Sequence, residues 1–317
     1  MKKIFLFLSL FTSLFVFAQN EQLAINYFDK GEFEKAIISF DELLKNQQGN
    51  SFYFQKIIES YQQLQQYDQA DKRLQERYAK YKQPSLLVEI GYNYQLQKDA
   101  GKAKKFYEQA ISKINENPSN VYAVANTFEK KVLLEYALES YNLAIKLEPK
   151  FKFNYQMAVI YGQLGKMDLM IDTFLEEAYS NQNNTIMIQN QLSRFMTEEA
   201  EETFNTALRK ALLVRAQKNQ DIFWNQFLSW FFVQQKDYAK AFIQEKAIYR
   251  RDPESFSNIV NLAELAMEEN EEETAKEIFA FVLENTQDLD LQIRAHYFLM
   301  ESKIQKAPEK EYPAIKS

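Results

Sequence analysis

Residues 86–111, LLVEIGYNYQLQKDAGKAKKFYEQAI, contain the pattern that decides the fold. Apolar residues recur every three or four positions on both sides of a polar stretch at Lys98–Gly101, which predicts two amphipathic helices joined by a turn. A small residue and an aromatic mark the first helix, and a small residue, an aromatic and another small residue mark the second. In this stretch the landmarks are Gly91, Tyr94, Ala103, Tyr107 and Ala110.

The same landmarks recur along the chain in register. Clear copies are Ala24, Tyr27, Ala36, Phe40 and Leu43; Ala125, Phe128, Ala137, Tyr141 and Ala144; Ala158, Tyr161, Met170 and Phe174; and Ala263, Ala275 and Phe279. The small anchor of the second helix is predicted at Ala36, Ala70, Ala103, Ala137, Met170, Ala200, Ala241 and Ala275, at steps of 34, 33, 34, 33, 30, 41 and 34. One hairpin cannot bury its apolar face alone, so the pattern predicts an all-α stack of antiparallel helix hairpins.

A period near 34 residues with these landmarks resembles the tetratricopeptide repeat family over roughly residues 20–287. The family's leading Trp is mostly absent, and its closing Pro is clear only at Pro149 and Pro253. The resemblance implies an α-α superhelix, a solenoid with no catalytic activity, whose concave face is lined by the first helices and binds a peptide or protein partner.

Carrying that geometry over gives a set of inward-facing candidates rich in Tyr, Gln and Asn. These concave-face candidates are Gln62, Tyr92, Tyr122, Asn126, Tyr155, Gln156, Gln226, Trp230 and Gln234. Such side chains combine hydrogen bonds with amphipathic contact area, which suits peptide recognition, although each of them is also suited to packing between repeats. The family's carboxylate clamp is not recognisable, because Asn126 and Lys130 are only a fragment of it.

Turn residues give more local expectations. Gly31 and Gly165 stand where a first helix must end and the chain must reverse, a common use of glycine. Asp68, Asp99 and Asp237 lie at comparable turns and are predicted to cap the second helices.

One unit breaks the register. Residues 181–220 combine a shortened first helix, Thr185–Met196, with a lengthened second helix, Ala200–Gln217. Ordinary drift of the repeat explains the break, and the alternative is a kink in the array or a junction between two stacks of repeats. The predicted organisation is a signal peptide at 1–18, a repeat array of about five units at 19–180, a divergent repeat at 181–220 and a second array at 221–317. The last repeat looks incomplete, as in a fragment of a longer repeat protein or a helix that a partner completes.

The first residues, MKKIFLFLSLFTSLFVFA, predict export. Lys2 and Lys3 precede an apolar run that is short for a membrane span, and small residues at Val16 and Ala18 suit cleavage before Gln19. The segment resembles secretory signals of Bacteroidota and implies a periplasmic, secreted protein; the alternative is an uncleaved N-terminal anchor. With no Cys, an N-terminal lipid anchor is excluded, as are disulfides and thiolate metal sites.

Candidate chemistry is sparse. The chain has one His, His296, 6 Gly and a formal net charge of −6, so it lacks paired imidazoles, a Gly-rich phosphate loop and the basic surface that nucleic acid rewards. The acidic run Glu268–Glu273 is interpreted as a solvated turn, with a loose cation site as the alternative. No cofactor and no metal is predicted.

The sequence therefore favours a non-catalytic interaction scaffold in the periplasm that holds a protein segment or joins subunits of an envelope assembly. A glycan-binding module is the alternative, because exposed rings at Tyr92, Tyr155 or Trp230 would stack on sugars.

Overall fold

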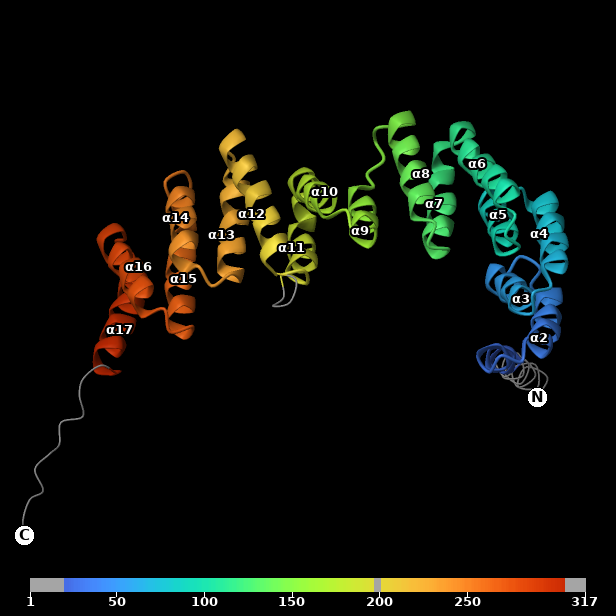
Figure 1. Ribbon diagram of the computed structural model, residues 1–317. Coiled ribbons are helices and arrows are strands. Elements are labelled where there is room, and N and C mark those ends of the chain that lie inside the picture. The colour runs from blue at the N-terminus through green and yellow to red at the C-terminus, as the bar shows by residue number, and fades with distance from the viewer. Residues whose placement is uncertain (1–19, 197–200, 306–317) are drawn as a thin grey trace, which may run out of the picture. The chain divides into compact units, whose positions relative to one another are not determined.

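A computed structural model describes residues 20–196 and 201–305, which form helices joined by short turns and contain no strand (Figure 1). Residues 20–29 are helical and precede the labelled elements. These are α2 (Phe33–Asn46), α3 (Ser51–Gln63), α4 (Tyr67–Tyr81), α5 (Ser85–Leu96), α6 (Ala100–Glu116), η1 (Pro118–Asn120), α7 (Val121–Lys130), α8 (Leu134–Leu147), α9 (Asn154–Gln163), α10 (Met167–Ser180), η2 (Gln182–Asn184), α11 (Thr185–Ser193), α12 (Glu201–Lys218), α13 (Ile222–Gln234), α14 (Tyr238–Tyr249), η3 (Pro253–Ser255), α15 (Phe256–Glu268), α16 (Glu272–Asn285) and α17 (Leu289–Gln305). The predicted all-α hairpin fold is confirmed.

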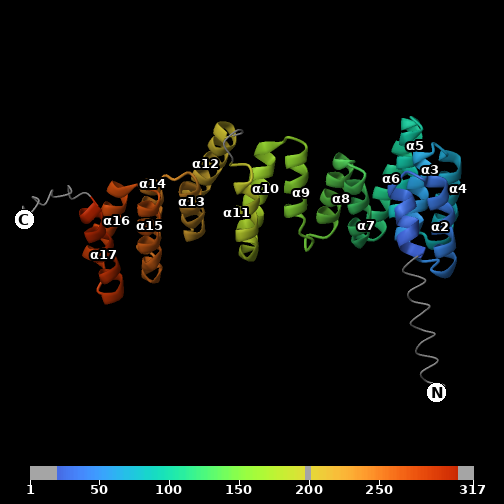
Figure 2. The ribbon, with the colours of Figure 1, turned by 90° about the horizontal axis from the view of Figure 1, so that it is seen from below.

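Within each unit, helices form antiparallel pairs, and neighbouring pairs pack on one another. In the first unit α5 pairs with α6 and α7 with α8, and the pairs lie side by side in both views (Figures 1 and 2). In the first unit a first helix also packs on the second helix of the preceding pair, as α3 does on α2 and α5 on α4. The small and aromatic landmarks line these contacts, since Ala36, Ala70, Ala103 and Ala137 are almost fully buried. Close helix approach at small residues, with rings filling the space beside them, is the physical basis of the pattern.

The chain divides into two compact units, residues 1–153 and 154–317. The division therefore falls at 153/154, whereas the register break near 181 lies inside the second unit. Side chains from the divergent repeat, Ile188, Leu192 and Phe204, belong to one hydrophobic core that extends through the second unit. Because α11 and α12 both pack on α10, the break does not interrupt this core.

In the hairpins whose turn the structure describes between helices up to α10 and from α13 on, the chain reverses at a residue in the left-handed region. The predicted Gly31 and Gly165 have φ of +76° and +68°, as expected for glycine at a helix C-terminus. Residues with side chains occupy the corresponding positions of other hairpins at intervals of 33 or 34 residues: Gln65, Lys98 and Val132, and later Lys236 and Asn270. The fold thus imposes the left-handed turn whether or not the sequence supplies glycine.

Two of the three predicted aspartate caps are confirmed. The side chain of Asp99 accepts a hydrogen bond from the Lys102 N–H, and that of Asp237 accepts one from the Lys240 N–H. The prediction for Asp68 is wrong, because α4 begins earlier and Asp68 lies within its first turn, where its negative charge suits the helix end.

The divergent repeat is more regular than its sequence indicates. α11 is short and α12 is long, as predicted. The predicted anchor Ala200 lies outside the described residues, and the first buried side chain of α12 is Phe204, 34 residues after Met170. Phe204, Leu208 and Leu212 are spaced like Met170, Phe174 and Ala178, so a large residue takes the anchor position. The steps around this repeat then become 34 and 37 in place of 30 and 41.

Candidate functional site

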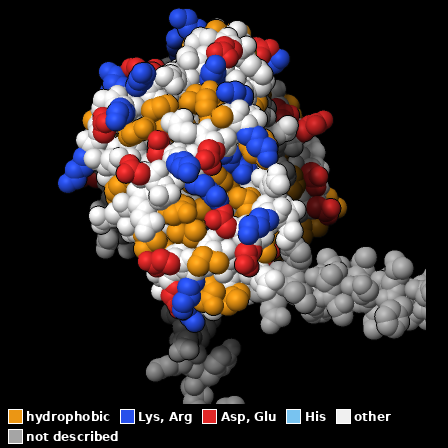
Figure 3. Space-filling model, turned by 90° about the vertical axis from the view of Figure 1, so that its right-hand side faces the viewer, with side chains coloured by type: hydrophobic (Ala, Val, Ile, Leu, Met, Phe, Trp, Pro, Cys, Tyr) orange, Lys and Arg blue, Asp and Glu red, His pale blue; other side chains and the backbone are white. Residues whose placement is uncertain are grey.

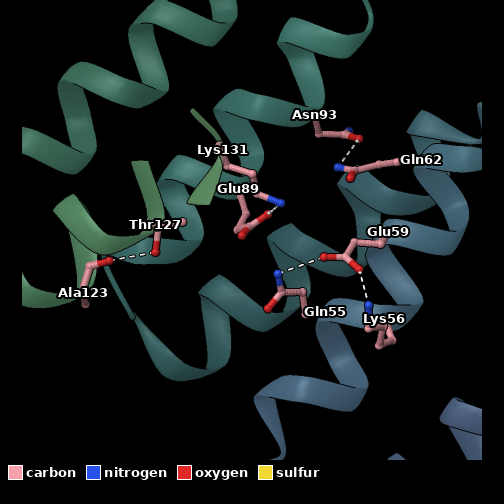
Figure 4. A network of polar contacts seen from close by, with 9 residues as sticks. All are labelled: Gln55, Lys56, Glu59, Gln62, Glu89, Asn93, Ala123, Thr127 and Lys131. Atoms are coloured by element: carbon pink, nitrogen blue, oxygen red, sulfur yellow. Dashed lines mark hydrogen bonds and ion pairs between the residues drawn. The ribbon is translucent and has the colours of Figure 1, made fainter. Parts of the chain in front are cut away.

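The first helices of the first unit, α3, α5 and α7, carry a row of polar side chains that we call the first-helix face (Figure 4). Gln62 of α3 donates from Nε2 to Oδ1 of Asn93 on α5 over 3.3 Å, and Asn93 donates in turn to the Tyr67 carbonyl over 3.0 Å. These bonds satisfy polar groups that are buried between neighbouring hairpins. They fix the positions of the first helices relative to one another.

An ion pair links α5 to the end of α7. The Glu89 carboxylate on α5 lies 3.0 Å from the Lys131 ammonium at the end of α7, and the two side chains are only 16% and 8% exposed. The same ammonium lies 4.8 Å from the centre of the Tyr92 ring. Burial raises the pKa of Glu89, and the charge of Lys131 opposes that shift. The pair is a largely desolvated charged link between hairpins.

The polar row continues on α3 with side chains that face solvent more openly. Glu59 accepts from Gln55 Nε2 over 2.9 Å and pairs with Lys56 Nζ at 3.0 Å (Figure 4). On α7 the Thr127 hydroxyl donates a hydrogen bond to the Ala123 carbonyl over 2.7 Å. The face therefore presents carboxylate, amide and ammonium groups held in place by their neighbours.

The structure separates the predicted candidates of the first unit into two kinds. Gln62 is buried and used between hairpins, and Tyr92 is half-buried beneath Lys131, so both contribute mainly to packing. Tyr122 and Asn126 on α7 are exposed. The Tyr122 ring is 58% exposed and rests edge-on against Phe151 and Phe153, which orients it without covering it.

In the second unit the candidates lie on α9 and α13. Gln156, Gln226 and Gln234 are exposed, whereas Tyr155 and Trp230 are half-buried. Tyr155 packs edge-on against Phe174, and Trp230 packs edge-on against Phe227. None of the three rings suggested for sugar stacking, Tyr92, Tyr155 and Trp230, is therefore an open platform.

The sequence interpretation missed the charged members of the face. Glu89 and Lys131 were not among the candidates, nor were Gln55 and Glu59. Helical spacing contains the signal, because Glu89 lies one turn before Tyr92, and Gln55 and Glu59 precede Gln62 at seven and three residues.

The last described helix, α17, exposes a row of large apolar side chains. Its exposed side chains include large apolar residues at intervals of three or four positions: Leu289, Ile293, Tyr297 and Met300, each more than half exposed. We call this set the α17 stripe. His296 is exposed on the same helix.

Within the described residues, no group of three or more His, Asp or Glu side chains is placed to hold a metal ion. Across the same residues no helix combines the length and apolar character needed to cross a bilayer. The acidic run Glu268–Glu273 lies at the turn between α15 and α16, as predicted.

Comparison with known proteins identifies the repeat. A family model described as tetratricopeptide repeat matches residues 84–112, which contain α5 and most of α6. None of the curated proteins matches the chain at a significant level.

Solved structures of repeat proteins are similar at low identity. The C-terminal part of a TPR repeat-containing protein from Cytophaga hutchinsonii is 17% identical, with 73% of this chain and 95% of that chain covered and a TM-score of 0.30. A tetratricopeptide repeat protein from Parabacteroides merdae is 11% identical, with 79% and 98% covered and a TM-score of 0.31. These TM-scores are too low to assign a family. The match to residues 84–112 makes the α5/α6 hairpin similar to a tetratricopeptide repeat, and the neighbouring hairpins share its landmarks and its left-handed turn.

Proposed function

We propose that this protein is a non-catalytic scaffold of the cell envelope that binds a peptide or protein partner on the first-helix face. Tetratricopeptide repeats generally mediate protein–protein interaction, and repeats that bury one side of each helix leave the other side free for a partner. The observation that supports the proposal best is the row on α3, α5 and α7. It presents fixed polar groups, and Tyr122 and Asn126 are exposed on α7, one of its three helices.

The chemistry of this face suits an extended peptide. Exposed amide and phenol groups donate and accept hydrogen bonds, and a Tyr ring adds apolar contact area at little loss of side-chain entropy. The polar partners Asn93 and Glu89 keep the first helices fixed, so a partner does not have to order them on binding.

Site-specific photo-crosslinking in the native envelope tests the proposal. A photoreactive residue at Asn126 on α7 is expected to capture a protein neighbour. The matched control is Lys105, which is exposed on the second helix α6 and is expected to capture much less. Equal recovery from both positions, or from neither, would contradict the proposed face.

The envelope location rests on residues 1–18, which lie outside the described residues. Fractionation with N-terminal sequencing tests it separately. The mature chain is expected in the periplasmic fraction, beginning at Gln19. A chain that keeps Met1 and sediments with membranes would show the uncleaved anchor instead.

A further inference from the structure

In the first unit, the second helices α2 and α4, together with Phe54 of α3, line an open groove with a volume of about 450 Å³. Its floor and walls include Leu44, Phe54 and Tyr81, and its charged lining includes four cations and two carboxylates. The face that carries α2 and α4 is seen in Figure 3, where Lys and Arg side chains lie beside hydrophobic ones.

The deepest charged group of this groove is Arg77. It is only 8% exposed, and among the described residues no carboxylate lies within ion-pair distance of it. Nη1 and Nη2 donate to the carbonyls of Gln48 and Gly49 over 3.3 and 3.2 Å, which uses two of its five N–H donors. Burial lowers the pKa of Arg77. A buried cation without a counter-charge is a costly arrangement unless an anion reaches it.

Aromatic rings hold the guanidinium in place. Its central carbon lies 4.3 Å from the centre of the Phe54 ring and 5.0 Å from that of Tyr81. The Tyr81 hydroxyl donates to the Gln48 carbonyl over 3.3 Å, which holds that ring at the edge of the groove. Arg77 is therefore pre-oriented, and an incoming acceptor does not have to order it.

The rim adds further positive charge. Arg73 is paired with Asp41, whereas Lys80 donates to the amide oxygen of Gln48 at 3.1 Å. Lys45 is exposed on the opposite wall. With four cations against two carboxylates the lining carries a net charge of +2, in a chain whose net charge is −6.

The corresponding groove of the second unit lies between the second helices α10 and α12 and has a volume of about 700 Å³. Its charged lining is Asp168, Asp172, Glu202, Lys210 and Arg215, a net charge of −1. Arg215 is paired with Asp172 at 2.8 Å. Among the described residues, a buried cation with no carboxylate at ion-pair distance is therefore found in the α2/α4 groove and not in the α10/α12 groove.

We propose that the α2/α4 groove binds an acidic peptide segment of a protein partner, with one carboxylate on Arg77 and an apolar side chain against Leu44 and Tyr81. Charge complementarity selects the acidic segment, and the apolar wall favours a peptide over a free inorganic anion. This site goes beyond the proposed function, because its charged lining lies on the second helices α2 and α4 and includes neither Tyr122 nor Asn126.

Fluorescence anisotropy with the full chain tests the proposal. The probe is a short labelled peptide in which glutamates flank one phenylalanine, and the reference probe carries glutamine in place of each glutamate. The acidic probe is expected to bind at least about tenfold more tightly than the reference probe, a difference of about 1.4 kcal/mol. Equal binding of the two probes would overturn the proposal.

Variants locate the site. The exposed pair Lys45→Gln and Lys80→Gln, combined, is expected to weaken the acidic probe about fivefold to tenfold without affecting the fold. Arg77→Met is expected to weaken it further, and its circular dichroism melting curve shows whether it is folded. Unchanged binding in the Lys45/Lys80 double variant would refute the site whatever Arg77→Met does.

Two matched controls separate this site from others. Lys210→Gln removes a cation from the α10/α12 groove, and Asn126→Ala changes the first-helix face. Both variants are expected to bind the acidic probe like the parent. Loss of binding in Asn126→Ala would assign the peptide to the first-helix face and would also overturn the proposal.

Discussion

Glu89 in the first unit and Glu245 in the second are both largely buried, yet their charges are compensated differently. Glu89 meets the ammonium of Lys131 at 3.0 Å. Glu245 accepts a hydrogen bond from the Ser229 hydroxyl through one oxygen, and its Oε2 has no hydrogen-bond partner among the described residues. The repeat thus sets where helices meet but does not set how a buried charge is compensated. Each unit solves that problem with local side chains.

The two units also distribute space between helices differently. In the α5/α6 hairpin the anchor is Ala103, and Gly91 opens room for the Tyr107 ring. In the α9/α10 hairpin the anchor is Met170, and the room for its sulfur is at Gly162. Close packing fixes the total side-chain volume that fits between two paired helices. A large residue on one helix therefore requires a small residue on the other, and the position of each differs from hairpin to hairpin.

Replacing the Glu89 carboxylate, which is paired with Lys131, should have the largest effect on stability. Glu89→Gln leaves the Lys131 ammonium buried without a counter-charge, and we expect the free energy of unfolding to fall by about 3–5 kcal/mol in urea titrations. Lys131→Met in the Glu89→Gln background should restore most of the loss, because both charges are then absent. Glu108→Gln is the control, since its pair with Lys104 is exposed and its loss should not change the unfolding curve. A Glu89→Gln variant as stable as the parent would show that the pair is not desolvated.

The glycine comparison should give the next largest effect. A Cβ at position 91 would lie 2.5 Å from Cε1 of Tyr107, whose ring is confined by Phe128 and Tyr136. We expect Gly91→Ala to destabilise the protein by about 1–3 kcal/mol in the same titration.

Gly162→Ala is the matched substitution in the second unit. Its Cβ would lie 2.7 Å from Sδ of Met170, but a thioether side chain adjusts more easily than a confined ring. Its loss should be clearly smaller than that of Gly91→Ala, and the reverse order would break the comparison.

The left-handed turns should give a smaller effect of opposite sign in the two units. Val132 has φ of +57° and is 74% exposed, so Val132→Gly relieves backbone strain and loses little packing. We expect a gain of about 1 kcal/mol, seen as a higher melting temperature. Gly165→Ala, at φ of +68° with open space around it, should lose about the same amount. A lower melting temperature for Val132→Gly would contradict the strain argument.

The smallest effect should depend on pH. Burial raises the pKa of Glu245, with the Ser229 hydroxyl opposing the shift, so the folded protein binds the proton more tightly than the unfolded chain does. The parent should therefore lose stability as the pH rises from the ordinary glutamate value through the raised pKa of Glu245. Glu245→Gln lacks this loss, and its stability relative to the parent should increase by about 0.5–1 kcal/mol between about pH 4 and about pH 7.

Melting curves of both proteins at the two pH values measure this difference. Glu89 titrates in both proteins, so its contribution cancels in the comparison. Curves that shift in parallel with pH would mean that the Glu245 carboxylate is solvated.

The hairpin fold was predictable because its cause is periodic. Small anchors such as Ala103 and rings such as Tyr107 repeat at a fixed spacing, and only stacked hairpins bury all of them at once. The left-handed turns were predictable only at Gly31 and Gly165. Val132 adopts the same left-handed conformation although β-branched residues disfavour it. In the divergent repeat the small residue Ala200 misled the register, because the large Phe204 fills the anchor position.

The candidate faces were less predictable, because they depend on contacts between residues distant in sequence. Gln62 and Tyr92 are residue types that often bind ligands. In the structure, however, Gln62 is hydrogen-bonded to Asn93, and the Tyr92 ring lies beneath the Lys131 ammonium. Arg77 in the sequence is one cation on a polar helix face. Only the structure shows that its side chain is buried and that no carboxylate of the described residues lies within ion-pair distance of it.

The α17 stripe bears on how the repeat array can be lengthened by design. Leu289, Ile293, Tyr297 and Met300 display the spacing with which one helix seats another. A consensus hairpin added after α17, in register with the repeat, could pack its apolar face against the α17 stripe. The second unit is therefore a suitable starting point for the design of longer repeat proteins.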